Sequence, residues 1–292
     1  MSSYQVTAVH RRLLHIRAPD GSELPARIGS RDLLAVCGDL VQCAFDTRHQ
    51  EWHVTGIEPR RNGLYRSNAR GGGELIAANL SQLVVVVAPL PRPDLFVADR
   101  YLSAAHCSGI RALILVNKCD LEMPAESDAD LAAYERAGIA LLRVSAHSGD
   151  LEALRSRLRG ETSILVGQSG VGKSSLLRAL LPSCEAPVGE LIRDDEGRHT
   201  TTVTRLHALP GGGDILDSPG VRDFAPAIDR LSGNALGFVE IENLRANCRF
   251  GDCRHLQEPD CAVRAAVEAG TLSARRYESY RRLRRLVTRL SR

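Results

Sequence analysis

Long apolar runs are missing from this sequence of 292 residues. The longest, LVVVVA from Leu83 to Ala88, falls far short of the roughly 20 apolar residues that a bilayer-spanning helix needs. The amino-terminal segment MSSYQVTAVHRRLL lacks the long apolar centre of a secretory signal peptide. We therefore expect a cytoplasmic protein. In that compartment the eight cysteines do not predict a disulfide framework, and a tight cysteine–histidine cluster would predict a metal site.

Lysine is almost absent as well. Of the 38 basic residues only two are lysines, Lys118 and Lys173, and the other 36 are arginines. We attribute this avoidance to compositional bias, so the two exceptions mark positions that require lysine. A broad guanidinium fork cannot replace a slim ammonium group that passes between backbone amides and phosphates. Both lysines lie in segments that resemble nucleotide-binding motifs.

A strong net charge is also lacking, and a formal charge of +3 does not by itself indicate a nucleic-acid-binding protein. The basic excess is concentrated in the last segment, SARRYESYRRLRRLVTRLSR, which has eight arginines against the single acid Glu278. Tyr280, Leu283, Val287 and Leu290 recur there at intervals of three and four. This spacing predicts a helix with one packed face and outward-facing arginines. Two interpretations of the arginine-rich face stay open, a solvated surface and a surface that binds RNA phosphates.

The pattern of the chain changes twice. Residues 1–66 alternate apolar and polar side chains in short runs, which predicts a small antiparallel β-barrel resembling the OB-fold. Residues 67–228 place apolar strands between helix-length segments, which predicts a parallel, doubly wound α/β sheet. Residues 229–292 are predicted to form a helical domain. The basic, glycine-rich stretch PRRNGLYRSNARGGGE after the barrel is interpreted as a linker.

The segment GQSGVGKSS has the spacing of a phosphate-binding loop between a strand and a helix. Its glycines permit a tight turn and a close backbone approach, Lys173 would neutralise the β- and γ-phosphate oxygens, and Ser174 would bind Mg²⁺. A chance glycine-rich turn would not explain the flanking strand and helix. The predicted loop residues are Gly167, Gln168, Ser169, Gly170, Val171, Gly172, Lys173, Ser174 and Ser175.

The tetrapeptide NKCD, from Asn117 to Asp120, follows another apolar run. The Asp120 carboxylate can accept both donors on the edge of guanine, whereas adenine does not offer this pair. Asn117 and the stem of Lys118 would hold the base and the neighbouring loop. An ordinary turn after a strand is the competing interpretation. Together with the phosphate loop, however, the tetrapeptide predicts GTP, and Ser145 and Ala146 after the next strand would contact guanine O6.

Two further segments resemble the switches of a GTPase. In DSPG, Asp217 would hold Mg²⁺ through water and the Gly220 amide would sense the γ-phosphate, although a simple turn is the alternative. In GRHTTT, either Thr200 or Thr201 would bind Mg²⁺ and close over the γ-phosphate. The choice between the two threonines stays open.

The water-orienting glutamine that many GTPases carry after the second-switch glycine is absent, and Val221 takes its place. This substitution predicts slow intrinsic hydrolysis. His199 is the nearest candidate to position water, and a solvated loop histidine is the competing interpretation. If His199→Ala left stimulated turnover unchanged, the catalytic role would be wrong.

The motifs occur in an unusual order, because both guanine motifs precede the phosphate loop and both switches. The order predicts a circularly permuted domain. Such a permutation preserves the site, since each motif lies on a loop at the carboxyl edge of a parallel sheet. It also places the second switch before the cysteine cluster in the sequence. A conformational change in the segment from Asp217 to Gly220 can therefore displace the last domain directly.

A cysteine–histidine cluster lies in CRFGDCRHLQEPDC. Three thiolates and one imidazole suit a structural, tetrahedral Zn²⁺ site without an open position for catalysis. Buried free cysteines beside a surface histidine are the alternative. The predicted ligands are Cys248, Cys253, His255 and Cys261, and the predicted packing residues are Cys37, Cys43, Cys107, Cys119 and Cys184.

Taken together, these segments resemble the circularly permuted, ribosome small subunit-dependent GTPase A family of bacteria. The resemblance rests on GDLV, ANLSQLVVVV, RYLSAA, NKCD, GQSGVGKSS, GRHTTT, DSPGVRDF, CRFGDCRH and EPDCAV, which span almost the whole chain. It implies a barrel, a GTPase domain and a zinc domain, with GTP hydrolysis to GDP and phosphate stimulated by the small subunit during its late maturation. It also implies a role for the switch histidine, here His199. Only a very short stretch precedes the barrel, so RNA contacts of a longer basic arm are not carried over.

The resemblance implies the small ribosomal subunit and its rRNA as partners, with Mg²⁺ at the nucleotide and one structural Zn²⁺. We expect a monomer with no membrane or DNA partner. One alternative is a GTP-regulated switch that binds a protein and hydrolyses GTP incidentally. An ATP-using enzyme is disfavoured by Asp120. GTP turnover with and without purified small subunits separates the first two functions.

Overall fold

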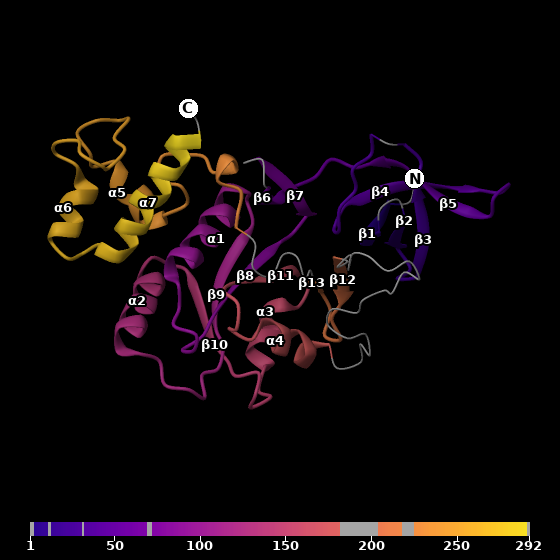
Figure 1. Ribbon diagram of the computed structural model, residues 1–292, viewed down its shortest axis with the longest axis horizontal. Helices are drawn as coiled ribbons and strands as arrows, with labels where there is room; N and C mark the ends of the chain where they lie inside the picture. Colours follow the sequence, from indigo (N-terminus) through magenta and orange to yellow (C-terminus); the bar gives the residue numbers. More distant parts are fainter. Residues whose placement is uncertain are drawn as a thin grey trace.

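The computed structural model describes residues 3–10, 13–30, 32–68, 72–181, 204–217 and 225–290. Figure 1 shows a group of strands at one end of the molecule, a central sheet with helices, and a group of helices at the other end. In the described part of the chain, no helix is both long enough and apolar enough to cross a membrane.

The first part is a small closed barrel. Its strands are β1 (Ser3–His10), β2 (Leu13–Arg17), β3 (Glu23–Ile28), β4 (Leu40–Asp46) and β5 (Glu51–Ile57). They follow the order β1-β2-β3-β5-β4, and β4 pairs back with β1, which closes the barrel. Every pair is antiparallel except β3–β5, which is parallel. Val6, Leu14, Ile16 and Val41 are fully buried inside it.

The predicted linker is wrong, because a hairpin forms in this stretch. Strands β6 (Gly63–Ser67) and β7 (Gly73–Ala78) pair in an antiparallel manner. Leu64 and Ala77 are fully buried in the same core as the central sheet. The glycine and arginine content of the segment therefore hid the core position Leu64.

The central sheet has the predicted doubly wound form. Its strands are β8 (Gln82–Val87), β9 (Arg111–Val116), β10 (Ala140–Arg143), β11 (Thr162–Val166), β12 (Arg205–Ala208) and β13 (Asp214–Asp217). In the order β10-β9-β8-β11-β13-β12, all pairs are parallel except the antiparallel pair β12–β13. Strand β12 also pairs with β1 at Ala8 and Arg205, so the sheet continues into the barrel.

Helices cover both faces of this sheet. Successive residues of β8 face opposite sides of the sheet. Val85 and Val87 pack in one core with helices α1 and α2, whereas Val84 and Val86 pack in another with α3 and α4. Because such a strand is buried on both faces, its sequence is a continuous run of apolar residues. The helices are α1 (Leu95–Cys107), α2 (Ala125–Arg136), α3 (Glu152–Leu158) and α4 (Lys173–Leu180).

The last part is helical, as predicted. It consists of the short 3₁₀-helix η1 (Ile228–Arg230) and the helices α5 (Val239–Arg245), α6 (Ala262–Glu268) and α7 (Ala274–Leu290). On α7, Tyr280 and Leu283 are fully buried as expected, but Leu290 is 54% exposed. The prediction that all arginines face outward is also wrong, because Arg276 is only 2% exposed.

Candidate functional site

The predicted nucleotide motifs meet at one edge of the sheet. Asn117 directly follows β9, Gly167 directly follows β11, and Asp217 is the last residue of β13. Ser145 follows β10 after one intervening residue. Because these strands are parallel, their carboxyl ends lie together, and a change in the order of the segments does not separate them.

The phosphate loop adopts a conformation that requires glycine. Gly167 and Gly172 have φ angles of 141° and 95°, which lie in the region that favours glycine. A Cβ atom at Gly167 would lie 2.2 Å from the Val86 carbonyl oxygen. Lys173 begins α4 and is only 5% exposed, and its Nζ donates hydrogen bonds to the carbonyl oxygens of Gly167 (2.7 Å) and Gln168 (2.8 Å). The ammonium group is thus held inside the loop, where phosphates would be bound.

The loop from Asn117 to Asp120, which we call the guanine-type loop, is hydrogen-bonded to the phosphate loop. Asn117 Nδ2 donates to the Val171 carbonyl oxygen at 2.8 Å, and Lys118 Nζ donates to the Gly170 carbonyl oxygen at 2.7 Å. Both lysines of the chain therefore bind main-chain oxygens of one loop. The predicted convergence of these two motifs is present in the fold.

The carboxylate of Asp120 lies at the exposed end of this arrangement. Ser145 Oγ donates to Asp120 Oδ1, and the Ala146 amide donates to Asn117 Oδ1 at 3.1 Å. The hydrogen bond from Ser145, followed by one from the backbone amide of Asp120 itself, lowers the pKa of Asp120 below its ordinary value. The side chain is therefore an ionised acceptor at neutral pH, as recognition of two guanine donors requires.

A proline-rich turn before α1 also belongs to this site, although no sequence motif marks it. The Leu90 carbonyl oxygen accepts a hydrogen bond from Lys118 Nζ at 2.7 Å. The Asp94 amide donates to Gln168 Oε1 at 3.1 Å. Both contacts use main-chain atoms of the turn, so no pattern of side chains in the sequence predicts them. We call residues 90–94 the α1 turn.

The remaining predicted site residues divide into two groups. Ser174 and Ser175 lie in the first turn of α4, directly after Lys173, and Ser169 is exposed on the phosphate loop. His199, Thr200, Thr201 and Gly220 lie outside the described residues, as does Cys184.

The four predicted metal ligands form a compact cluster. Their ligand atoms all lie within 4.8 Å of one another. Both Cys248 Sγ and Cys261 Sγ lie 3.5 Å from His255 Nδ1, and the two sulfur atoms are 4.0 Å apart. A tetrahedral Zn²⁺ ion with ordinary bond lengths separates sulfur from nitrogen by about 3.5 Å and sulfur from sulfur by about 3.8 Å. The donor set and its spacing therefore fit a tetrahedral Zn²⁺ ion.

The burial of the ligand residues also agrees with a metal site. His255 is fully buried and Cys253 is 1% exposed. Burial lowers the pKa of His255, so its imidazole is neutral and able to bind a metal. Burial raises the pKa of the Cys253 thiol to about 12. A bound cation would provide the positive charge that thiolates need in such a place.

A carboxylate that the sequence did not single out fixes the turn between the ligands. Glu258 accepts hydrogen bonds from the backbone amides of Arg254 (2.9 Å), Leu256 (2.8 Å) and Gln257 (3.0 Å). Burial of this side chain opposes ionisation, but the backbone donors outweigh it and lower the pKa of Glu258 to about 2. Glu258 thus orders the loop that follows His255.

Not every remaining cysteine is a packing residue. Cys37 is buried, and Cys43 and Cys107 are partly buried, in agreement with the prediction. Cys119 is exposed, so the prediction is wrong for that position. The reason is that Cys119 lies within the guanine-type loop, where the strand has already ended.

Comparisons with known proteins give consistent matches. Residues 57–226 match the family model described as RsgA GTPase. A protein of Azotobacter vinelandii named small ribosomal subunit biogenesis GTPase RsgA is 46% identical over 230 residues, which is 77% of this chain and 67% of that protein. A protein of the same name from Pseudomonas aeruginosa strain LESB58 is also 46% identical over 230 residues, covering 77% of this chain and 68% of that protein.

Solved structures resemble the fold of the chain as a whole. The crystal structure of YjeQ from Thermotoga maritima has a TM-score of 0.73 at 24% identity and covers 99% of this chain and 98% of that chain. The structure of YloQ, described as a circularly permuted GTPase, has a TM-score of 0.72 at 24% identity, with 99% and 94% coverage. These likenesses support the permuted arrangement of barrel, sheet and terminal helices.

Proposed function

This chain belongs to the RsgA GTPase family, and on that premise we propose that it acts on the small ribosomal subunit. It is a GTP hydrolase. In the proposed reaction it binds the subunit during late maturation, hydrolyses GTP to GDP and phosphate, and is stimulated by the subunit to do so. The proposal extends to this chain the function in the names of its relatives.

One observation carries the nucleotide part of the proposal. Asn117 and Lys118 donate hydrogen bonds to the Val171 and Gly170 carbonyl oxygens, so the guanine-type loop and the phosphate loop form one unit. A single nucleotide that spans both loops would place its base near Asp120 and its phosphates near Lys173.

Each residue of the site then has a defined role. Asp120 would accept the two guanine donors, and Ser145 would hold its carboxylate in place. Lys173 would leave the loop carbonyls and bind the β- and γ-phosphate oxygens, as lysines of this loop type do. Ser174 and Asp217 would hold Mg²⁺, which neutralises the charge that develops on the phosphates.

The switch residues complete the proposed reaction. Thr200 or Thr201 would bind Mg²⁺, the Gly220 amide would contact the γ-phosphate, and His199 would orient water. Val221 stands where many GTPases have glutamine, so slow intrinsic turnover is proposed.

The other parts of the chain are proposed to bind the particle. We propose domain boundaries at residues 1–66, 67–228 and 229–292. The Cys₃His cluster would hold a structural Zn²⁺ that orders the terminal domain, and the barrel and the exposed arginines of α7 would bind rRNA phosphates. We further propose a cytoplasmic monomer with no membrane or DNA partner.

Turnover of GTP with and without purified small ribosomal subunits tests the proposal. We expect slow hydrolysis alone and a large stimulation by the subunits, with loss of turnover in Lys173→Ala. An Asp120→Asn variant should lose its preference for GTP over inosine and adenine nucleotides. Absence of stimulation would favour a switch that binds a protein and hydrolyses GTP incidentally. Equal competition by ATP would exclude guanine recognition.

A further inference from the structure

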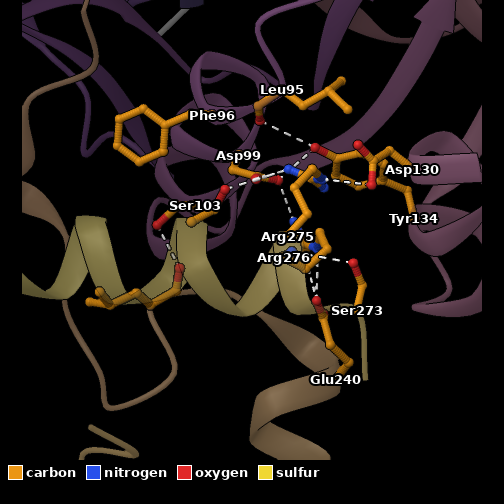
Figure 2. Close-up of polar contacts among 12 residues, drawn as sticks. Leu95, Phe96, Asp99, Ser103, Asp130, Tyr134, Glu240, Ser273, Arg275 and Arg276 are labelled. Carbon is orange, nitrogen blue, oxygen red and sulfur yellow. Dashed lines mark hydrogen bonds and ion pairs between the residues drawn. The ribbon is translucent and has the colours of Figure 1, made fainter. Parts of the chain in front are cut away.

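An arginine of the terminal helix is buried against the nucleotide-binding part of the chain. Arg276 of α7 donates through Nη1 to Asp99 of α1, and its Nε and Nη2 both lie 2.7 Å from Glu240 Oε1. Its guanidinium carbon lies 4.8 Å from the ring centre of Tyr134 and 4.5 Å from that of Phe238. Figure 2 shows Arg276 lying among Asp99, Tyr134 and Glu240.

Asp99 is the centre of this network. It is 1% exposed and also accepts hydrogen bonds from Arg275 Nη1 (2.8 Å) and the Tyr134 hydroxyl (2.7 Å). Buried ion pairs of this kind contribute little net stability, because desolvation offsets the attraction, but they demand a particular geometry. The network is therefore better suited to fix the orientation of α7 on α1 than to stabilise the fold.

The contact continues along one face of α1. Ser103 Oγ donates to the Leu236 carbonyl oxygen, and Cys107 Sγ lies 3.5 Å from the Ser232 carbonyl oxygen. Asp99, Ser103 and Cys107 are spaced at four-residue intervals, so they lie on the same side of the helix. This side of α1 is the surface on which the terminal helical part docks.

The α1 turn, which leads directly into α1, contacts both nucleotide loops. Asp94 caps the helix through its carboxylate, while its amide donates to Gln168 of the phosphate loop at 3.1 Å. Four residues earlier, the Leu90 carbonyl oxygen accepts from Lys118 of the guanine-type loop. The α1 turn thus contacts the nucleotide loops, and the helix of 13 residues that follows it contacts the terminal helices along its side.

We propose that Asp99 and Arg276 are positioning residues that couple nucleotide binding to the docking of α7. The inference rests on the nucleotide site proposed above. An α-helix moves as a rigid unit, so a shift of α1 under α7 displaces the α1 turn, on which Gln168 and Lys118 depend. Coupling of this kind is reciprocal, so a ligand that moves α7 changes nucleotide affinity, and a nucleotide changes the docking of α7.

A purely structural role makes a different prediction. The opposite side of α1 packs in the core of the sheet through Ala98, Tyr101 and Ala105, which could hold the α1 turn in place without any help from α7. In that case, loss of the ion pair would loosen the terminal helices and leave nucleotide affinity unchanged. Affinity and α7 protection must therefore both be measured.

The test uses the full chain and a fluorescent GDP analogue. Arg276→Met keeps the aliphatic bulk and leaves Asp99 paired with Arg275 and Tyr134. Arg285→Met is the matched control, because Arg285 is an exposed residue of the same helix. We expect Arg276→Met to raise the dissociation constant at least about fivefold, the lower end of typical coupling, and Arg285→Met to leave it unchanged. Zinc content and thermal unfolding establish that each variant is folded.

Hydrogen exchange gives a second measurement, which begins with the unmodified protein. In the unmodified protein, GDP should slow amide exchange in residues 274–280 of α7 as well as in the phosphate loop. In Arg276→Met, protection should remain in the phosphate loop and disappear from α7. A structural role alone would not make α7 respond to GDP.

The outcomes separate the two proposals. If the unmodified protein does not bind guanine nucleotides, the proposed function is wrong and the coupling is excluded with it. If it binds GDP while a folded Arg276→Met variant keeps the same affinity, only the coupling is overturned. Should that variant not fold, the absence of GDP-dependent protection in α7 of the unmodified protein would overturn the coupling, and its presence would support it.

Discussion

Asn117 Nδ2 donates a hydrogen bond of 2.8 Å to the carbonyl oxygen of Val171, across 54 positions of sequence. The contact joins a loop after β9 to the phosphate loop after β11. Gly172 is the next residue, and a Cβ atom added there would lie 2.3 Å from the same Asn117 nitrogen. The bond therefore depends on the absence of a side chain at Gly172.

Gly172→Ala is expected to separate the two loops. The new methyl group would displace Asn117, and alanine would also be strained at a φ of 95°. The lost hydrogen bond and the strain together amount to about 2–4 kcal/mol. Titration with a fluorescent GDP analogue should show at least a tenfold loss of affinity, the equivalent of about 1.4 kcal/mol.

Gly149→Ala is the matched control for this change. Gly149 also has a positive φ, 79°, but a Cβ atom there would meet nothing within 4 Å. It should therefore lower stability through strain alone and leave nucleotide affinity near its original value. Equal affinities for the Gly172 and Gly149 variants would contradict a role for the Asn117 contact.

The sequence predicted this convergence but not all of its supports. The motifs NKCD and GQSGVGKSS directly follow apolar strands. The carboxyl ends of parallel strands lie together at one edge of the sheet, whatever the order of the strands in the sequence. The α1 turn was missed because Leu90 and Asp94 contribute main-chain atoms, which carry no sequence signal. Burial of Arg276 was missed for a different reason. It depends on Asp99, which lies 177 positions away, whereas helical periodicity counts any arginine as exposed.

Lys173→Arg is expected to weaken nucleotide binding strongly although the positive charge is kept. Lys173 is 5% exposed and bonded to the Gly167 and Gln168 carbonyl oxygens at 2.7 and 2.8 Å. A planar guanidinium is too broad for this position. Loss of one charged hydrogen bond costs about 1.5–3 kcal/mol, so affinity should fall at least about tenfold.

The control for this variant is Arg178→Lys, at an exposed position of the same helix. It makes the reverse exchange and should leave affinity for the GDP analogue unchanged. If Lys173→Arg bound nucleotide as well as the original protein, the scarcity of lysine elsewhere would have no bearing on the site.

Removal of metal is expected to unfold the terminal helical part. Cys253, His255 and Cys261 are buried, and structural Zn²⁺ contributes on the order of 10 kcal/mol to the folding of such segments. Elemental analysis should find one zinc per chain, and Cys261→Ser should lose it together with the protection of α6 and α7 from proteolysis. Cys43→Ser, in the barrel, should retain the metal. A metal-free protein with unchanged protease resistance would refute a structural site.

Glu258 gives the terminal part a stability that depends on pH. The folded-state pKa of Glu258 is about 2, below its ordinary value of 4.5, because backbone amides bind the ionised carboxylate. A depressed pKa adds stability that is complete above the ordinary pKa and is lost as pH falls toward the folded-state pKa. Ionised Glu258 should therefore stabilise the fold at pH 7, and this contribution should decline between about pH 4.5 and pH 2.

Unfolding of Glu258→Gln beside the original protein tests this dependence. The difference in unfolding free energy should be largest at pH 7 and should shrink below about pH 4.5, because glutamine lacks the charge that the backbone amides bind. Loss of metal at low pH would affect both proteins, so their difference isolates the carboxylate. Glu242→Gln, at an exposed position where the side chain pairs with Arg245, should change stability by no more than about 1 kcal/mol at any pH. A difference for Glu258→Gln that stayed constant down to pH 3 would show that the hydrogen bonds to the three amides do not depend on the charge.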